Sequence, residues 1–435
     1  MTQYTNYKDS GIFWTPRIPS GWETTYLRYI LHKENREKDP DSELLICSNS
    51  GHVIKRGDSK QGLVAESNDV YQGVKKGDLL IHGMDTWHGA IGISGFDGMC
   101  TPVVHVCTSS QNIRFVAYYL KMMANAKVFK LISNGVRQNT SDFRSWDKVA
   151  RLPIFLPSIE EQDKIVEYLD HKISLIESFN KQKENELQLL NEIKIAFISS
   201  AVSHGLDPNV PMKDSGIPMV GQIPAHWDVE PFGRHFTYGK GLPITKADLV
   251  SEGLAVISYG QIHSKRNNGS TITKELIRRV SSDYLKTHPQ CILQPNDFVF
   301  ADTSEDIEGS GNFAFNDYSE TLFAGYHTLI ARPKDLLLPK YYAFLFQSVG
   351  WKSQVQSMVN GVKVFSIGRK HLKNTSLLIP PLNEQSAIVN YLEGKTKRID
   401  AMIQALQDEI DYLAEYKQRL IWDVVTGQVN VNKTI

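Results

Sequence analysis

Cysteine is scarce in this chain, with four residues in 435. No two of them have the Cys-x-x-Cys spacing, which argues against a disulfide framework and against a zinc site built on thiolates. Long apolar runs are also missing, since none approaches the roughly 18 residues that a membrane helix needs. The first residues, MTQYTNYKDSG, show no basic stretch followed by an apolar one, so we expect no export signal and a cytoplasmic protein. The cysteines are then expected to be reduced and mostly buried: Cys47, Cys100, Cys107 and Cys291.

Net charge is absent too, because 48 lysines and arginines balance 48 aspartates and glutamates. The balance conceals a segregation along the chain. Basic residues are in excess by five in 51–151 and by four in 237–380, whereas acidic residues are in excess by four in 158–205 and by two in 381–435. This alternation suits two modules that face a polyanion, joined by acidic segments that face something else.

Common catalytic motifs are missing as well. The sequence has no Gly-x-x-x-x-Gly-Lys-Ser/Thr phosphate loop and no His-Glu-x-x-His zinc motif. It also lacks the Asn/Asp-Pro-Pro-aromatic tetrapeptide with which a DNA amino-methyltransferase would hold a flipped base. A loose pattern of two carboxylates and a lysine, Asp41, Asp58 and Lys60, could hold Mg²⁺ near a scissile phosphate, but so short a pattern is common by chance. Metal-dependent DNA cleavage therefore stays an alternative.

An internal repeat is what the sequence does contain. The repeated pairs are residues 9–12 with 214–217 (both DSGI), 18–22 with 223–227 (IPxxW) and 157–162 with 380–385 (PSIEEQ and PPLNEQ). Between these anchors the halves diverge, and only 77–81 (GDLLI) and 134–136 (NGV) have weak counterparts, at 296–300 and 360–362. The order of the pieces is leading segment, module and helix, repeated once. The duplication implies a pseudo-twofold axis.

The segments after 158 and 381 have the period of coiled-coil helices. In the second copy an apolar residue recurs every seven positions, and a second apolar series lies four residues after members of the first. In the first copy only Lys183 interrupts the corresponding seven-residue series. A helix from about 158 to 203 would be roughly 65–70 Å long. Neither helix can bury its apolar row alone, so we expect the two helices to form an antiparallel pair. The predicted seam comprises Leu169, Ile176, Leu190 and Phe197 in the first helix and Leu392, Ile399, Leu406, Leu413 and Leu420 in the second.

The basic regions have a different pattern, with short apolar runs bounded by glycine, aspartate and proline, followed by short helical stretches. The predicted fold class is therefore α+β: two mixed α/β modules separated by two long antiparallel coiled-coil helices, with an internal pseudo-twofold repeat. The expected boundaries are a first module at 1–156, a central helix at 157–205, a linker and second module at 206–379, and a C-terminal helix at 380–435.

Polar clusters in both modules could read DNA, because Arg and Lys can bind guanine or phosphate, and Asn and Gln can bind adenine. Each of these residues, taken singly, is more often a solvated surface residue or a phosphate contact than a base reader. The candidates are Lys55, Arg56, Lys60, Gln61, Arg137, Gln138, Asn139 and Arg144 in the first module, and Gln261, His263, Lys265, Arg266, Asn267, Asn268 and Lys363 in the second.

Taken together, these motifs resemble the specificity (S) subunits of type I restriction-modification systems. The resemblance rests on the IPxxW segments, the GDLL run at 77–80, the Pro-x-x-x-Glu-Gln helix starts and the twofold order of module and helix, and it extends from end to end. It implies two target-recognition domains, each reading one half of a bipartite DNA site, and a helix pair that acts as a ruler between them. Divergent module interiors imply an asymmetric site.

The resemblance also implies partners and a division of labour. Methyltransferase (M) subunits, two of them by expectation, and restriction (R) subunits would dock on the helices, with double-stranded DNA as the ligand and no membrane contact. This chain would be non-catalytic, while AdoMet, Mg²⁺ and ATP would bind to the partner subunits. Two other interpretations stay open: a stand-alone nuclease using Asp41, Asp58 and Lys60, and a scaffold that binds without reading sequence.

Overall fold

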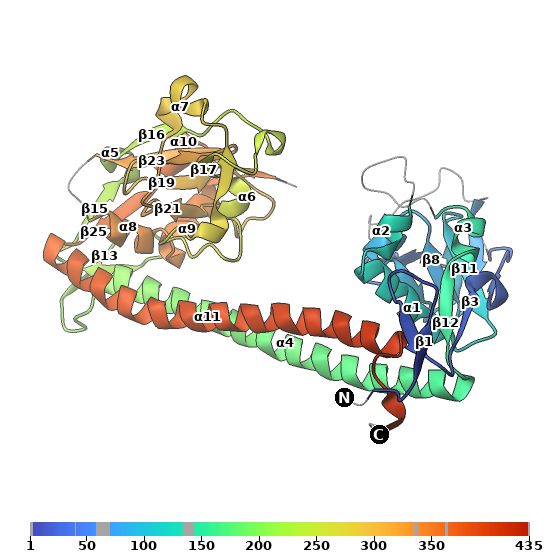
Figure 1. Cartoon of the computed structure of the whole chain (residues 1–435). Helices are drawn as coiled ribbons and strands as arrows, with labels where there is room; N and C mark the ends of the chain where they lie inside the picture. Colours follow the sequence, from blue (N-terminus) through green and yellow to red (C-terminus); the bar gives the residue numbers. More distant parts are fainter. Residues whose placement is uncertain are drawn as a thin grey trace. The chain divides into compact units, whose positions relative to one another are not determined.

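The chain folds into two compact units, which are described separately below. Unit 1 consists of Met1–Gln182 and Glu409–Ile435, and unit 2 is Lys183–Asp408. Within the described ranges, no helix combines the length and the apolar character that crossing a membrane requires. The computed structural model describes residues 3–39, 41–57, 70–133, 143–334, 338–361 and 364–433, and many of its elements are labelled in Figure 1.

Unit 1 contains twelve described strands and parts of two long helices. The strands are β1 (Tyr7–Asp9), β2 (Arg17–Pro19), β3 (Glu23–Tyr26), β4 (Leu31–Lys33), β5 (Leu45–Cys47), β6 (Val53–Lys55), β7 (Gln72–Val74), β8 (Leu79–His82), β9 (Ile91–Ile93), β10 (Gly98–Cys100), β11 (Val104–Ser109) and β12 (Pro153–Leu156). The helices are α1 (Ile113–Asn125), α2 (Val128–Ile132), α3 (Trp146–Ala150) and parts of α4 (Ile159–His204) and α11 (Leu382–Val425). Four strands form the central antiparallel sheet, in the order β4-β11-β8-β9.

The core of unit 1 joins this sheet to α1. The helix begins after Asn112, whose side-chain oxygen accepts hydrogen bonds from the backbone N–H groups of Arg114 (2.9 Å) and Phe115 (3.2 Å), an N-cap. Its apolar face is buried in the same cluster as Leu420 and Val424 from the end of α11. Residues from both ends of the chain therefore build one core.

Unit 2 repeats the central sheet and adds a second one. The strands are β13 (Met212–Asp214), β14 (Gln222–Pro224), β15 (Asp228–Pro231), β16 (Phe236–Lys240), β17 (Leu254–Ile257), β18 (Arg278–Val280), β19 (Phe298–Ala301), β20 (Thr303–Ser304), β21 (Phe313–Phe315), β22 (Leu322–Ala324), β23 (Thr328–Pro333), β24 (Phe365–Ser366) and β25 (Ser376–Ile379). The short helices are α5 (Phe232–His235), α6 (Tyr259–Ile262), α7 (Tyr284–Thr287), α8 (Pro339–Leu345), α9 (Val349–Met358) and α10 (Arg369–Lys373). The central sheet has the order β16-β23-β19-β21, and β17 pairs with β18 and, in parallel, with β22.

Aromatic side chains dominate the core of unit 2. The Phe232 ring stacks on Phe236 at a centroid distance of 4.3 Å, and Phe346 lies 4.5 Å from Trp351 and 5.0 Å from Phe298. Rings packed in this way contribute about 0.5–1.5 kcal/mol per pair beyond the area that they bury. The central sheets of the two units thus have the same strand order, but the side chains of the cores that they cover differ. This agrees with the divergence of the module interiors.

The weak match between residues 77–81 and 296–300 is confirmed by the structure. In both units a residue with positive φ, Gly77 (96°) or Asn296 (70°), precedes a buried aspartate, Asp78 or Asp297. Each carboxylate accepts a hydrogen bond from the backbone N–H three residues earlier, at 2.7 Å, and pairs with an arginine. The strand that follows is β8 or β19, in equivalent places of the two sheets. The other weak match, 134–136, lies outside the described residues.

The duplicated leading segments and helix starts are bonded to each other in both units. The indole Nε1 of Trp22 donates to Glu161 Oε2 at 3.1 Å, and Nε1 of Trp227 donates to Glu384 Oε2 at 2.9 Å. Both tryptophans are almost completely buried. The IPxxW and Glu-Gln motifs therefore recur together because each is half of one contact.

The buried glutamines of the helix starts add a second contact to each repeat. Gln162 donates to the carbonyl of the proline five residues earlier (3.0 Å) and accepts from the N–H of Asn112 (3.1 Å). Gln385 donates to its own proline (2.8 Å) and accepts from the N–H of Leu338 (3.3 Å). Each glutamine thus fixes the start of a long helix to the residue that precedes α1 or α8.

In each unit an ion pair links α4 to α11. Lys417 Nζ lies 2.6 Å from Glu177 Oε1 in unit 1, and Lys194 Nζ lies 2.6 Å from Asp400 Oδ1 in unit 2. The helix-start motifs at 157 and 380 are 223 residues apart, and the same spacing relates Lys194 to Lys417 and Glu177 to Asp400. The ion pairs are therefore counterparts in the repeat, and in each unit the two helices run antiparallel.

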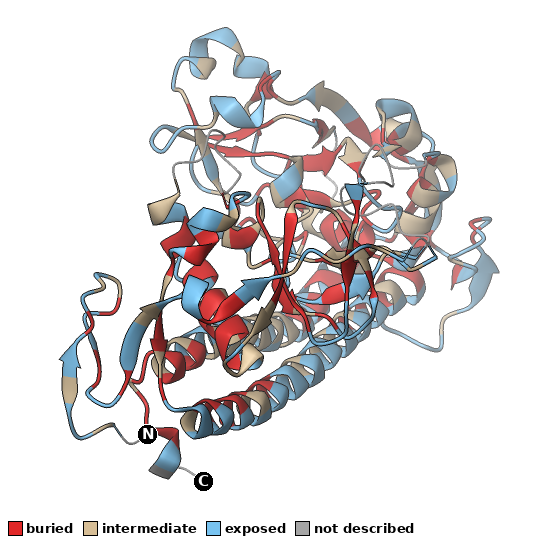
Figure 2. Cartoon of the chain, turned by 90° about the vertical axis from the view of Figure 1, so that its right-hand side faces the viewer, coloured by how far each residue is buried: buried red, intermediate tan, exposed pale blue. Residues whose placement is uncertain are grey.

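Most of the predicted seam lies inside the helix pair. Leu392 and Leu420 are buried and the residues between them in the row, Ile399, Leu406 and Leu413, are half-buried; in α4, Leu169 and Ile176 are buried and Leu190 is half-buried. The outer faces of both helices are exposed along most of their length (Figure 2).

The prediction for Phe197 is wrong. This side chain is 37% exposed, whereas the next residue, Ile198, is completely buried. An α-helix has 3.6 residues per turn, so a row of every seventh residue drifts by about 20° per heptad unless the helices supercoil. After four heptads the inward position has moved on by one residue. Phe197 instead lies near Lys395, whose Nζ is 5.8 Å from the ring centre.

Candidate nucleic-acid interface

The first module presents only part of its predicted DNA-binding set within the described residues. Lys55, at the end of β6, pairs with Glu43 (Nζ to Oε2, 2.5 Å) and lies over the Phe96 ring at 5.2 Å. Arg56 is half-buried and Arg144 is exposed. The remaining candidates lie outside the described residues: Lys60, Gln61, Arg137, Gln138 and Asn139.

In the second module, two of the DNA-binding candidates are hydrogen-bonded within the fold. Gln261 accepts a hydrogen bond from the backbone N–H of Ser258 at 3.2 Å, which caps α6. Nε2 of His263 donates to the carbonyl of Thr303 (2.8 Å), and its Nδ1 accepts from the Asn312 amide (3.1 Å). Both ring nitrogens of His263 are thus occupied.

Two asparagines of the loop after α6 also serve the fold. Asn267 donates to the carbonyls of Ile262 (2.7 Å) and Phe313 (2.9 Å). Asn268 Oδ1 accepts from the backbone N–H groups two and three residues later, at 3.0 Å each. These amides shape the loop. Base contacts by Gln261, His263, Asn267 and Asn268 stay a prediction, and any such contact would compete with the bonds described.

The charged side chains of the same loop are differently placed. Lys265 and Arg266 are exposed, and Arg266 pairs with Glu275 at 3.1 Å. Lys265 and Arg266 thus present two cationic side chains to solvent, as a phosphate contact requires. Lys363 lies outside the described residues.

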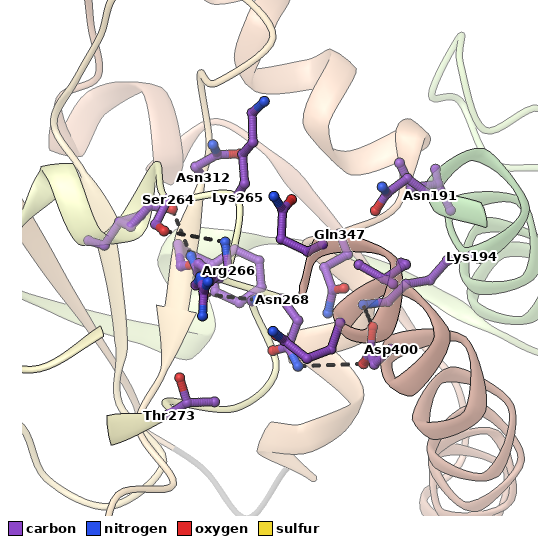
Figure 3. A pocket seen from close by; sticks show the side chains of 18 of the residues that line it. Asn191, Lys194, Ser264, Lys265, Arg266, Asn268, Thr273, Asn312, Gln347 and Asp400 are labelled. Carbon is purple, nitrogen blue, oxygen red and sulfur yellow. Dashed lines mark hydrogen bonds and ion pairs between the residues drawn. The ribbon is translucent and has the colours of Figure 1, made fainter. Parts of the chain in front are cut away.

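A hollow of about 590 Å³ separates this loop from the segments of α4 and α11 in unit 2 (Figure 3). We call it the unit 2 hollow. Lys194 and Asp400 lie on its helix side, and Lys265, Arg266 and Asn268 lie on its loop side. The amide of Asn268 reaches across it to Asp400 Oδ2 at 3.5 Å. Its lining mixes apolar side chains with neutral polar ones, and its charged side chains are four cations and one carboxylate.

Sequence reasoning missed three charged residues of this hollow: Lys194, Lys352 and Asp400. The expectation of a pure apolar seam concealed Lys194 and Asp400, although their spacing from Lys417 and Glu177 is a signal that the sequence carries. Nothing local marks Lys352, whose amine donates to Asn312 Oδ1 at 2.7 Å across a long sequence separation.

Neither metal chemistry nor thiol chemistry finds support in the part of the chain that the structure describes. No group of three or more His, Cys, Asp or Glu side chains is placed there to hold a metal ion. Asp41 is exposed, while Asp58 and Lys60 lie outside the described residues. All four cysteines are buried and unbridged, as expected, and burial raises the pKa of both Cys47 and Cys100 to about 12.

Known proteins share this organisation. Residues 19–189 and 239–412 match the family described as Type I restriction modification DNA specificity domain. The putative type I restriction enzyme MjaX specificity subunit of Methanocaldococcus jannaschii is 22% identical over 95% of this chain and 95% of that protein. The MjaVIII specificity subunit of the same organism is 23% identical over 64% of this chain, and the match spans 63% of that protein. The EcoKI specificity subunit of Escherichia coli K12 is 21% identical over 48% of this chain and 44% of that protein.

A solved structure extends the likeness to the fold. The structure, described as "Structural basis underlying complex assembly and conformational transition of the type I R-M system", superposes with a TM-score of 0.60 and 15% identity, covering 95% of this chain and 99% of its own. The two matched regions span most of the sequence; the first contains the central sheet of unit 1 and the second contains most of the central sheet of unit 2. The chain therefore belongs to the type I restriction modification DNA specificity domain family.

Proposed function

We propose that this chain is the DNA sequence-specificity subunit of a type I restriction-modification complex. The observation that carries the proposal is the duplication of one family domain, with the same sheet order and the same helix-start contacts in both copies but different cores and loops. A shared frame with divergent surfaces suits the recognition of two different half-sites. The target is then an asymmetric bipartite DNA sequence.

The loops supply the DNA contacts in this proposal. Arginine and lysine side chains can bind phosphates or the O6 and N7 atoms of guanine in the major groove. Lys265 and Arg266 are exposed in unit 2, and Arg144 is exposed in unit 1, so all three are free of burial. We expect phosphate contacts first from these residues, since such contacts set affinity and register before bases are read.

The long helices supply the protein contacts. Large apolar side chains are exposed on their outer faces within unit 1, namely Leu175 (42%) and Phe179 (54%) on α4 and Tyr412 (69%) and Tyr416 (44%) on α11. Apolar residues grouped on an exposed face are typical of a protein interface. We assign this face to a methyltransferase subunit. Two such subunits and the restriction subunits would complete the assembly.

This division of labour leaves the chemistry to the partners. In the proposed complex, AdoMet is held by the methyltransferase subunits, and ATP and Mg²⁺ support the restriction subunits. The present chain contributes recognition and no catalytic group. A stand-alone nuclease based on Asp41, Asp58 and Lys60 has no observation in its favour, and purified chain that leaves DNA intact in the presence of Mg²⁺ alone would remove it.

The decisive experiment maps N6-methyladenine across the host genome with and without this gene. We expect deletion to abolish methylation at one asymmetric bipartite motif and at no other, because one S subunit specifies one site. Restoring the gene on a plasmid should restore the motif. An unchanged methylome in a strain whose methyltransferase subunit is expressed would refute the proposal.

A further inference from the structure

The unit 2 hollow has an excess of positive charge. Its lining includes four cationic side chains, Lys194, Lys265, Arg266 and Lys352, against one carboxylate, Asp400. Asp400 is already engaged, since Lys194 Nζ lies 2.6 Å from one of its oxygens and the Asn268 amide lies 3.5 Å from the other. Arg266 is paired as well, with Glu275 at 3.1 Å. The lining therefore keeps an excess of about two positive charges, on Lys265 and Lys352, which favours an anionic occupant.

Lys352 is a partly buried cation of this lining with a neutral hydrogen-bond acceptor. It extends from α9, is half-buried, and donates to a neutral amide oxygen, Asn312 Oδ1, at 2.7 Å. No carboxylate of the described residues lies within ion-pair distance of its amine. Burial lowers the pKa of Lys352, and the more distant Asp306 only partly opposes this effect. An anion bound beside the amine would offset the loss of hydration.

The same place in unit 1 is built differently. Asn112 and Leu338 are counterparts in the two units, because each donates its backbone N–H to the glutamine of a helix start. The residues nine positions later, Lys121 and Gln347, are therefore counterparts as well. Lys121 extends to the carbonyl of Gly51, at 3.0 Å. Gln347 instead turns back to a carbonyl four residues earlier, at 2.8 Å, and lines the hollow. An open cationic hollow is thus a feature of the second unit.

We infer that the unit 2 hollow binds a phosphate group, held by Lys352 and Lys265 with Arg266 at the rim. The inference rests on the proposed function, because a DNA backbone is the phosphate that a specificity subunit meets. A free nucleotide offers the same chemistry, and the experiment below separates the two sources. The contact would anchor DNA next to the helix pair without reading any base.

The test uses the full-length chain in complex with its methyltransferase partner. Binding of duplex DNA is measured by fluorescence anisotropy over a series of NaCl concentrations, for wild type, Lys352→Gln and Lys265→Gln. Loss of one phosphate contact should reduce the slope of log K against log salt by about 0.9, equally for specific and non-specific duplexes. Lys265 is exposed, so its variant keeps the test valid should Lys352→Gln fold poorly. Lys286→Gln, on α7 and outside the lining, is the matched control.

A second arm titrates inorganic phosphate and AMP against the same proteins, followed by ³¹P line broadening. Reduced salt slopes in both variants but not in the control support a site for backbone phosphate. Unchanged slopes with AMP binding that both variants lose support the phosphate site with a nucleotide as its occupant. Unchanged slopes without binding of either probe overturn the inference, and normal genomic methylation by the same variants would show that the proposed function survives it.

Discussion

Buried carboxylates at equivalent turns stabilise both central sheets. Asp297 is completely buried and binds Arg332 through both oxygens, with Nε–Oδ1 at 2.9 Å and Nη2–Oδ2 at 2.7 Å. Removing one partner of such a pair leaves the other uncompensated. Asp297→Ala should therefore lower the free energy of unfolding by about 3 kcal/mol, measured by urea denaturation. Asp302→Ala is the control: its carboxylate pairs at 3.2 Å with the exposed His327 and should contribute less than about 1 kcal/mol.

His105 makes unit 1 sensitive to acid. The ring is buried, its Nε2 lies 2.7 Å from the carbonyl of Phe143, and its Nδ1 has no partner among the described residues. Burial is the largest cause that lowers the pKa of His105, with a smaller contribution from Lys33, while the Phe143 carbonyl opposes it. A histidine whose folded pKa lies below its unfolded value stabilises the protein fully above the unfolded value, about 6.5, and less as pH falls below it.

The prediction is a fall in the urea midpoint of the transition that involves unit 1 as pH is lowered from neutral towards 5. His105→Gln, which cannot charge, should flatten this dependence while lowering the midpoint at neutral pH. A residual dependence of the midpoint on pH should remain in the variant, because burial also lowers the pKa of His82. Equal slopes for wild type and His105→Gln would contradict the assignment.

Residue types alone identified the second module's loop as polar but not how its atoms are used. Asn267 and His263 have the donor geometry of base readers, yet their partners are carbonyls of Phe313 and Thr303, some forty residues away in sequence. Such partners appear only when the chain is folded. The exposure of Lys265 could be predicted from the sequence, because an exposed lysine needs no partner from a distant part of the chain.

The register of α4 can be tested with adjacent residues. Ile198 is completely buried and Phe197 is 37% exposed. Ile198→Ala should lower the free energy of unfolding by about 2–4 kcal/mol, whereas Phe197→Ala should cost less than about 1 kcal/mol, by thermal or urea denaturation. A strict heptad seam would give the opposite order.

Repeat-related ion pairs offer a second comparison at the level of the helices. The Lys194 side chain is 9% exposed, whereas Lys417 is 32% exposed and its partner Glu177 is 55% exposed. Lys194→Gln leaves Asp400 without its strongest partner and should cost about 2–3 kcal/mol, while Lys417→Gln should cost at most about 1 kcal/mol. Added salt should reduce the second difference more than the first. Equal losses would mean that burial does not distinguish the two pairs.

The long helices were the most predictable elements. A start near 158 and an end near 203 compare with Ile159 and His204, because a proline, a polar cap and a sustained apolar period mark such boundaries locally. The Ser158 cap is present, its Oγ accepting from the N–H of Glu161 at 3.3 Å. The Glu161 carboxylate, however, binds Trp22 instead of completing a capping box, which is a tertiary contact that the local pattern does not contain.

Spacing between half-sites is the property of the whole molecule that the helices should control. An insertion of four residues near Lys183 should lengthen the non-specific spacer of the methylated motif and leave both half-sites unchanged, as read by genome-wide methylation mapping. Half-sites on one face of DNA are separated by about one helical turn or a multiple, roughly 34–36 Å. Insertion of four residues into the exposed loop at 319–321 is the control and should leave the spacer as it is. An unchanged spacer in the helix variant would refute the ruler.

At the scale of the whole chain, the repeat predicted two modules and two helices but not which residues make a compact unit. Both long helices pass from one unit to the other, so the boundary falls at Gln182 and Glu409 within them. Proline and capping residues in the sequence mark where a helix begins. They do not indicate which half of a helix packs against which module. Contacts such as those of Leu420 and Val424 with the unit 1 core supply that information.

This division has a consequence for synthesis on the ribosome. Unit 2 is one continuous stretch, Lys183–Asp408, and can assemble as it emerges. Unit 1 begins first, yet its core needs Leu420, Val424 and Val431, which follow unit 2 in the chain. The segment of unit 1 that is made before unit 2 can therefore complete its core only after unit 2 has been made, and until then part of its apolar surface stays uncovered.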